Sequence, residues 1–211
     1  MNIEPLWELR VRTPRLELRL PREDELLELF SVAEAGIHPP EEMPFFVAWT
    51  DDLRLEPFLE FHRGCWESWA PDKWSLNLIT YLEGHPIGTQ GISAENFAGD
   101  REVTTGSWLG APYQRKGLGT EQRAAVLELA FRGLGARTAT SGALVHNVAS
   151  QRVSQKLGYR TTGMRTLAPR GEPIPHYDYR LDRESWRCPV RVELEGVEGC
   201  LPLFGAVTRS R

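Results

Sequence analysis

The sequence contains no apolar stretch long enough to cross a bilayer, and residues after Met1 lack the apolar core of a secretion signal. A membrane-spanning helix needs about 20 consecutive, mostly apolar residues, and charged residues interrupt every apolar run of this chain earlier than that. We therefore expect a cytoplasmic protein that has no membrane partner.

Cysteine is also scarce. Cys65, Cys188 and Cys200 are the three cysteines, and they lie far apart without metal-binding spacing. A small, odd and dispersed set of cysteines predicts reduced thiols. This distribution argues against a disulfide framework, and it favours neither a metal site nor a catalytic cysteine.

Neither sign of charge is in large excess. The formal net charge is −4, and the basic residues do not gather in one block. Because nucleic-acid binding needs a concentrated basic surface, no nucleic-acid partner is expected. A length of 211 residues with 41% hydrophobic residues is typical of one globular domain with a complete core.

What the sequence does have is a basic, glycine-bearing loop at residues 114–120, between a predicted strand and a predicted helix. Gly117 and Gly119 allow positive φ angles and a close approach by a ligand. The first amides of a helix have no internal partner and carry the positive end of the helix dipole. Together with Arg115 and Lys116, these amides predict a binding site for a pyrophosphate group.

The spacing excludes two other phosphate-binding loops. A Walker loop requires a lysine after its last glycine, whereas Thr120 follows Gly119 here. The dinucleotide fingerprint requires a third glycine at the position of Gln122. The remaining pattern is glutamine or arginine, two residues, glycine, one residue, and glycine or alanine. For so short a motif, a basic surface turn without a ligand is the alternative interpretation.

This pattern resembles the acyl-CoA loop of the GNAT (GCN5-related N-acyltransferase) superfamily. The run 106–121 resembles the branch that contains the ribosomal-protein N-terminal acetyltransferases. The segment 13–16 resembles the opening of that branch, and 147–150 with 156–159 resemble its later part. The resemblance extends from about residue 15 to residue 186. It implies that the coenzyme is bound by Leu109, Gln114, Arg115, Lys116, Gly117, Leu118, Gly119, Thr120, Asn147 and Ser150.

Hydrophobic periodicity predicts the order of the elements. Strands are expected at 15–20, 74–82, 87–92, 102–109, 137–145, from 159 onward and at 177–181, and helices at 23–35, 52–69, 121–132, 147–157 and 182–186. This order predicts a single-domain α+β fold with a mixed sheet flanked by helices, and the resemblance implies a mostly antiparallel sheet. Residues 1–188 are expected to form the domain. Residues 189–211 are expected to form a C-terminal strand or hairpin, packed on the domain or on the second subunit of a homodimer.

The helix after the loop is expected to be apolar around nearly its whole surface, with Glu121, Glu128 and Arg132 as its one narrow polar strip. Such a helix is buried on several sides and would hold the loop rigidly. The apolar segment 43–49 is expected to plug the core, to form one wall of an acceptor pocket, or to do both.

The resemblance implies an enzyme that moves an acyl group from a coenzyme A thioester to a primary amine by direct attack in a ternary complex. It implies that the backbone amide of Leu109 stabilises the oxyanion. Ser154 occupies the usual place of the proton donor to the thiolate, and Ser150 is the alternative donor. Helix capping is the competing role for Ser150 and for Asn147, which the resemblance places on the pantetheine arm.

The general base is expected among Glu102, Glu172, His176 and Asp178, and a water molecule is the remaining option. His176 ranks first because an unperturbed imidazole titrates near neutral pH. The related branch often carries an aspartate in the final hairpin, but the nearest register places Pro175 at that position.

The sequence leaves two identities for the acyl group, acetyl and succinyl. A succinyl group needs a cation near the thioester, and Arg165, Arg170 and Arg180 are the candidates. The acceptor is equally open among a small molecule, a peptide N-terminus and a lysine side chain. A catalytically silent domain that binds acyl-CoA and has a regulatory or sensing role is the alternative to an enzyme. No metal is expected.

Overall fold

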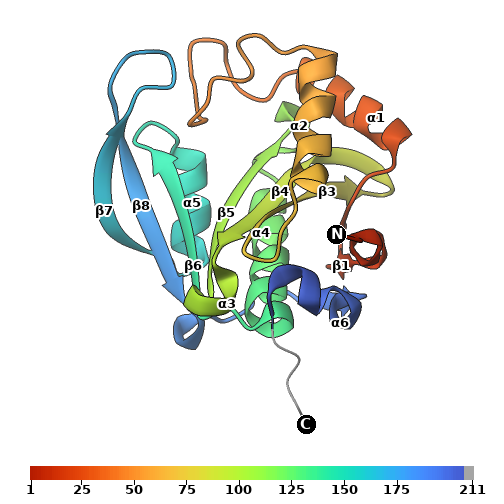
Figure 1. Cartoon of the computed structure of the whole chain (residues 1–211). Helices are drawn as coiled ribbons and strands as arrows, with labels where there is room; N and C mark the ends of the chain where they lie inside the picture. Colours follow the sequence, from red (N-terminus) through yellow and green to blue (C-terminus); the bar gives the residue numbers. More distant parts are fainter. Residues whose placement is uncertain (207–211) are drawn as a thin grey trace.

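A computed structural model describes residues 1–206 of the chain, which form one sheet of nine strands with helices on both faces (Figure 1). The strands are β1 Arg10–Arg12, β2 Leu16–Arg19, β3 Lys73–Leu82, β4 His85–Glu95, β5 Glu102–Leu109, β6 Thr138–Leu144, β7 Arg160–Leu167, β8 Ile174–Asp182 and β9 Glu193–Glu195. The helices are α1 Glu23–Glu34, α2 Leu55–Glu67, α3 Phe97–Asp100, α4 Leu118–Glu128, α5 Val148–Lys156 and α6 Val197–Cys200. Shorter helical segments are η1 Glu4–Glu8, η2 Ala111–Tyr113, η3 Leu129–Leu134, η4 Arg183–Ser185 and η5 Leu201–Phe204.

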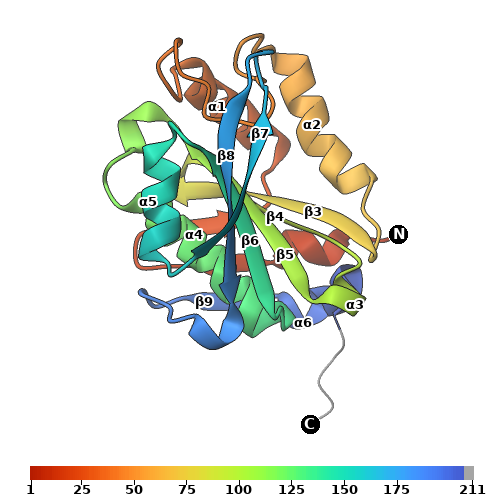
Figure 2. The same cartoon turned by 90° about the vertical axis from the view of Figure 1, so that its left-hand side faces the viewer.

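The sheet has the strand order β7-β8-β6-β5-β4-β3-β2-β1-β9, and only the β5–β6 pair is parallel. Helices α4 and α5 lie on one side of the strands and α2 lies on the other (Figure 2). The larger core joins α4 to the sheet, and a second core joins α1 and α2 to the opposite face. The expected α+β fold with a mixed, mostly antiparallel sheet is confirmed.

Helix α4 differs in two ways from the expectation. It begins at Leu118, three residues early, because Gly117 at its N-cap adopts a left-handed conformation with φ +80° that starts the helix directly. Its polar residues are also not confined to one narrow strip. Gln122 and Arg123 are buried together with Glu121, so that expectation was wrong. The Gln122 amide oxygen accepts a hydrogen bond from Thr80 Oγ1 at 2.9 Å.

The C-terminal extension forms a strand and not a hairpin. Strand β9 pairs with β1 at the edge of the sheet, and the chain then enters the short helix α6. The indole nitrogens of Trp69 and Trp74 donate hydrogen bonds to the carbonyl oxygens of Leu203 and Phe204. The extension therefore packs on its own domain. The proposed boundary at residue 188 and a contact with a second subunit stay predictions, and residues 207–211 lie outside the described part.

Candidate active site

Strands β5 and β6 diverge soon after they begin. They pair as parallel neighbours only at Glu102–Thr138, Val103–Ala139 and Thr104–Thr140, although both strands continue beyond these pairs. Figure 1 shows them separating from the end near α3 towards the opposite end of the sheet. We call this opening the fork. Backbone groups that line a fork have no strand opposite them, so they are available to a ligand.

The backbone alternation of β5 directs the Leu109 amide into the fork. The amide of Gly110 donates to Ile87 O of β4 at 2.9 Å. Because the N–H groups of consecutive strand residues point to opposite edges, the N–H of Leu109 points away from β4, towards the fork. The resemblance implies that this amide stabilises the oxyanion. The direction of the Leu109 N–H is compatible with that role, which stays a prediction.

The basic loop lies at the open end of the fork. Arg115 and Gly117 have positive φ angles of 59° and 80°, and α4 starts at the next residue. This geometry exposes the first amides of a long, buried helix at the end of the loop. The side-chain amide of Gln114 is engaged within the protein. Its amide nitrogen donates to Leu109 O at 2.7 Å and to Ile37 O at 2.6 Å, so it fixes the loop to the end of β5.

Arg15 adds a cation to this loop from a distant part of the chain. Its Nε donates to Glu121 Oε2 at 2.7 Å, and its Nη1 donates to Lys116 O at 3.1 Å. Thr13 Oγ1 donates to Glu121 Oε1 at 2.7 Å. Glu121 is buried in the first turn of α4, and Arg15 neutralises an acid that would otherwise repel an anion at the helix N-terminus.

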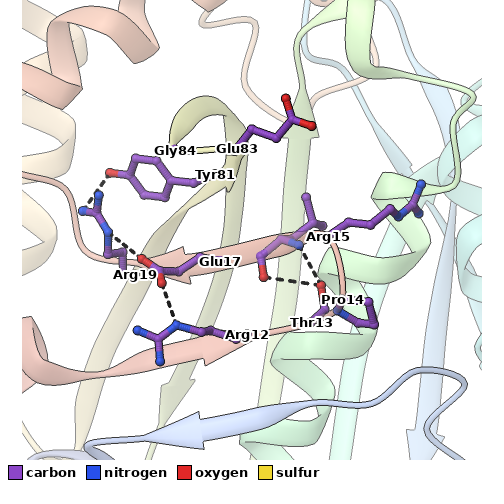
Figure 3. A pocket seen from close by; sticks show the side chains of 10 residues that line it. Arg12, Thr13, Pro14, Arg15, Glu17, Arg19, Tyr81, Glu83 and Gly84 are labelled. Atoms are coloured by element: carbon purple, nitrogen blue, oxygen red, sulfur yellow. Dashed lines mark hydrogen bonds and ion pairs between the residues drawn. The ribbon is translucent and has the colours of Figure 1, made fainter.

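A hollow lies beside the Arg15–Glu121 ion pair. It is lined by residues of the β1–β2 turn and by Tyr81, Glu83 and Gly84 (Figure 3). Arg12 and Arg19, two of its cations, both form ion pairs with Glu17. In Figure 3, Arg15 extends away from this pair towards the start of α4. The hollow is therefore nearly neutral, and the free positive potential is at the loop.

The start of α5 forms the β6 side of the fork entrance. Asn147 caps the helix, because its Oδ1 accepts from the Ser150 amide at 3.0 Å. Its Nδ2 donates to Pro44 O at 3.3 Å. The capping role expected as the alternative for Asn147 is thus present. Ser154 lies one turn after Ser150 and is fully buried, and its hydroxyl has no partner within residues 1–206.

His176 lies on β8 with its ring across the neighbouring strand. A Cβ added to Gly142 of β6 would be 2.3 Å from His176 Nε2, so the ring rests on the bare backbone there. Its Nδ1 is 3.3 Å from Asp178 Oδ1 and 3.4 Å from Arg165 Nε. Its Nε2 is buried without a partner among the described residues. Burial, and secondly the charge of Arg165, lower the pKa of His176, while Asp178 opposes the shift.

The segment between α1 and α2 spans the fork entrance. Backbone oxygens of Gly36 and Ile37 accept hydrogen bonds from Ala111 N and Gln114 Nε2 on the β5 side. On the β6 side, Met43 O is 2.9 Å from His146 Nε2. Aromatic residues come after Met43 in the same segment. Trp49 packs on Trp108 of β5 with ring centroids 5.8 Å apart, and Phe46 contacts the His176 ring at 4.6 Å. Met43 is buried whereas Phe46 is 48% exposed, so the segment both fills space and presents a wall.

The remaining candidates from the sequence are engaged elsewhere or are peripheral. Glu102 pairs with Arg180 beside the closed end of the fork. Arg170 forms a two-pronged ion pair with Asp51, and Glu172 is exposed on the β7–β8 connection. The structure therefore places Leu109, the basic loop and the start of α5 around the fork, and His176 with Asp178 on strand β8, next to β6. Glu102 and Glu172 lie apart from them.

Sequence reasoning missed two cations of this site, Arg15 and Arg123. Arg123 projects from α4 between the two strands of the fork, where it donates to Ser107 Oγ at 2.9 Å and to Ser141 Oγ at 3.0 Å. Its one signal in the sequence is a charge within a helix that was expected to be nearly apolar. Arg15 was noted only as the first residue of a predicted strand and as part of the segment 13–16 that resembles the opening of the related branch.

Within the described range 1–206, no three histidine, cysteine or acidic side chains are close enough to hold a metal ion. Nor is any helix of that range long and apolar enough to cross a membrane.

Comparison with known proteins agrees with this fold. Residues 15–160 match the model of the acetyltransferase (GNAT) domain. A putative ribosomal-protein-serine acetyltransferase from Vibrio cholerae is similar in structure, with 21% identity, a TM-score of 0.66 and coverage of 82% of this chain and 97% of that one. RimJ of Mycobacterium smegmatis with a coenzyme A disulfide is 16% identical, with a TM-score of 0.69 and coverage of 94% and 95%. RimL, a ribosomal L7/L12 alpha-N-protein acetyltransferase solved with coenzyme A, is 15% identical, with a TM-score of 0.69 and coverage of 82% and 97%.

Proposed function

This chain belongs to the GNAT acetyltransferase family, and on that premise we propose that it transfers an acyl group, acetyl or succinyl, from coenzyme A to a primary amine. The observation that carries the proposal is that the basic N-terminus of α4 lies beside Leu109, whose amide points into the fork. A pyrophosphate at the helix N-terminus leads the pantetheine arm between β5 and β6, and the thioester then meets the Leu109 amide.

The Leu109 N–H stabilises the charge that develops on the thioester oxygen. It is fixed by the β4–β5 pairing, and Gln114 holds the carbonyl of the same residue. A donor that is already in place needs no reorganisation when the tetrahedral intermediate forms, so the stabilisation is realised in full.

His176 removes the proton from the attacking amine. We assign the imidazole proton to Nδ1, which donates it to the Asp178 carboxylate and does not accept the long 3.4 Å contact from Arg165 Nε. The lone pair of Nε2 is then unpaired, on the side of the ring that covers Gly142. The depressed pKa keeps the imidazole neutral at physiological pH, as a base requires. Phe46 shields the ring from bulk water, so the acceptor displaces Phe46 or passes along its edge.

The step balances without a cofactor. The amine nitrogen forms a bond to the acyl carbon, the amine proton passes to His176, the C–S bond breaks, and the thiolate takes up a proton. The buried hydroxyl of Ser154 can donate to the sulfur, because no group within residues 1–206 uses it. Ser150, at the more open start of α5, is the alternative donor.

The acceptor amine approaches on the face that carries Trp49, Trp108 and Phe46. RimL acts on the ribosomal protein L7/L12, and the Vibrio cholerae protein is named as a ribosomal-protein-serine acetyltransferase. Protein N-termini therefore join small amines and lysine side chains on the panel of acceptors to be tested. We further propose that the enzyme is cytoplasmic and forms a homodimer through its C-terminal extension.

The test measures coenzyme A thiol release from acetyl-CoA and succinyl-CoA with a panel of amines, peptides and polyamines, and identifies the acylated product by mass spectrometry. Amine-dependent thiol release is expected, and His176→Gln should lower kcat by about 100-fold or more, the typical contribution of a general base. Binding of coenzyme A without thiol release for any amine would favour the silent, regulatory domain.

A further inference from the structure

Arg123 is a buried cation at the apex of the fork. Its side chain is 3% exposed, and its guanidinium spans the two strands just past their last paired residues, Thr104 and Thr140. Nη2 donates to Ser107 Oγ on β5 at 2.9 Å, and Nη1 donates to Ser141 Oγ on β6 at 3.0 Å. A weaker contact of 3.4 Å joins Nε to Gln90 Oε1.

This cation has no acidic partner within residues 1–206. Its neighbours are neutral oxygens, including the hydroxyl of Tyr159. A guanidinium has five N–H donors and stays protonated, so neutral acceptors alone leave its charge uncompensated. An unpaired buried charge is strongly destabilising, and buried cations are therefore normally paired.

The arginines that were expected to read a charged acyl group all have acids of their own. Arg165 pairs with Asp178, Arg170 with Asp51, and Arg180 with Glu102. Arg123 differs from them in being buried, unpaired with an acid and aimed between β5 and β6. Its missing anion is best supplied by a ligand of the fork.

The bound donor would extend towards this cation. The loop lies at the open end of the fork, so the acyl group, at the far end of the pantetheine arm, lies nearest the apex. Leu109 and Ser107 are two residues apart on the same edge of β5, about 6.6 Å along an extended strand. A short acyl chain that starts at the Leu109 amide covers that distance and places its terminal atoms beside Ser107 and Arg123.

We propose that Arg123 binds the terminal carboxylate of the acyl group, so that the preferred donor is a coenzyme A thioester of a short dicarboxylic acid of succinyl length. The inference rests on the proposed function and specifies the acyl donor of that reaction. The Arg123 guanidinium and the Ser107 hydroxyl would share the carboxylate as donors. Transfer would leave a free carboxylate on the amide product, and a basic amine would become an acidic amide.

The test compares succinyl-CoA with butyryl-CoA, whose acyl chain has the same number of carbons but ends in a methyl group. Calorimetry on the full chain requires no acceptor. We expect succinyl-CoA to bind at least about tenfold more tightly than butyryl-CoA, the scale of one charged hydrogen-bonded pair. Equal binding, or tighter binding of butyryl-CoA, would overturn the inference, whereas failure of every thioester to bind would remove the proposed function instead.

Variants separate recognition from structure. Arg123→Met should bring the succinyl-to-butyryl affinity ratio close to one, Arg123→Lys should retain part of it, and Arg132→Met, a control near the end of the same helical segment, should keep the wild-type ratio. Equal losses for both donors in Arg123→Met would mean a purely structural cation. If Arg123→Met does not fold, Ser107→Ala gives a second readout, and an undiminished ratio in it would contradict the proposed carboxylate contact.

Discussion

The His176 ring occupies the space that a side chain at residue 142 would need, and a Cβ on Gly142 would lie 2.3 Å from both Cε1 and Nε2 of the imidazole. Gly142→Ala should therefore displace the ring and move Nε2 out of line with the thioester. We expect kcat to fall roughly 10- to 100-fold with little change in the affinity for coenzyme A, because misplacing a catalytic group costs rate more than binding. Steady-state kinetics combined with calorimetry measures both quantities.

Gly106→Ala is the matched control. Gly106 lies on β5, and a Cβ there would meet no atom within 4 Å. This variant should retain its activity. Equal activity of the two variants would show that the position of His176 does not matter for the rate.

The charges that flank His176 predict two opposite shifts of the pH–rate profile. The pKa of His176 lies below its ordinary value of 6.5, so kcat/KM should fall as the pH drops through that lower pKa and protonates the base. Arg165 lowers this pKa and Asp178 raises it. Arg165→Met should therefore move the acidic limb to higher pH, and Asp178→Asn should move it to lower pH with a loss of rate.

The pH profiles are to be measured with one acceptor throughout, because the acceptor amine titrates identically with every variant. Shifts of the same sign in both variants, or no shift in either, would mean that another group sets the limb.

Arg15 predicts a charge effect on coenzyme binding. Arg15→Met should weaken coenzyme A binding roughly three- to tenfold, about 0.7–1.4 kcal/mol, because the loop loses a cation and Glu121 loses its ion pair. The effect should shrink as salt rises, since Arg15 is half exposed. Titration calorimetry at two salt concentrations measures it.

Arg12→Met is the control for that variant, because Arg12 belongs to the same turn but pairs with Glu17 and Glu195. The double variant Arg15→Met, Glu121→Gln removes the unpaired buried acid and should recover part of the lost affinity. If Arg12→Met weakened coenzyme A binding equally, the effect of Arg15 would come from the general positive charge of this surface and from no specific contact.

Glu25 predicts a pH dependence of stability. Burial raises the pKa of this carboxyl, but hydrogen bonds from Arg19, the Arg22 amide and Tyr81 outweigh burial and lower the pKa to about 2. Since the folded-state pKa is depressed, the stabilisation is complete above the ordinary value of 4.5 and is lost as the pH falls towards 2. Glu25→Gln should cost up to about 3 kcal/mol at pH 7 and flatten the dependence below pH 4.5.

Urea unfolding between pH 7 and pH 3 measures this difference. Glu23→Gln, which removes an exposed acid paired with Arg63, should follow the wild-type curve. Parallel curves for wild type and Glu25→Gln would show that Glu25 carries no acid-sensitive stability.

Local patterns predicted much of this fold. The strand 102–109 was placed correctly to the residue, and the alternation of 15–20 marked β2. The glycines of the loop also predicted the start of a helix close to its observed position, because helix starts depend on a few neighbouring residues. The pyrophosphate site at this helix start stays a prediction. The resemblance then narrowed the site to Leu109 and the start of α5.

Long-range contacts set the limit of the sequence analysis. The Arg15–Glu121 ion pair joins residues that are 106 positions apart, and no local pattern marks it. Arg123 was missed because this helix was expected to be nearly apolar around its whole surface. The role of Arg123 also depends on the point where β5 and β6 diverge, which the sequence does not reveal. The ranking of His176 rested on its residue type alone. The glycine that gives its ring room lies on another strand.

The central claim is that the fork and the loop together hold coenzyme A. Titration calorimetry of the purified chain with coenzyme A tests it most directly. One molecule per chain, with a Kd of about 1–100 μM in the range usual for enzyme substrates, is the predicted result. No heat of binding, together with no rise in the unfolding temperature at millimolar coenzyme A, would contradict the account.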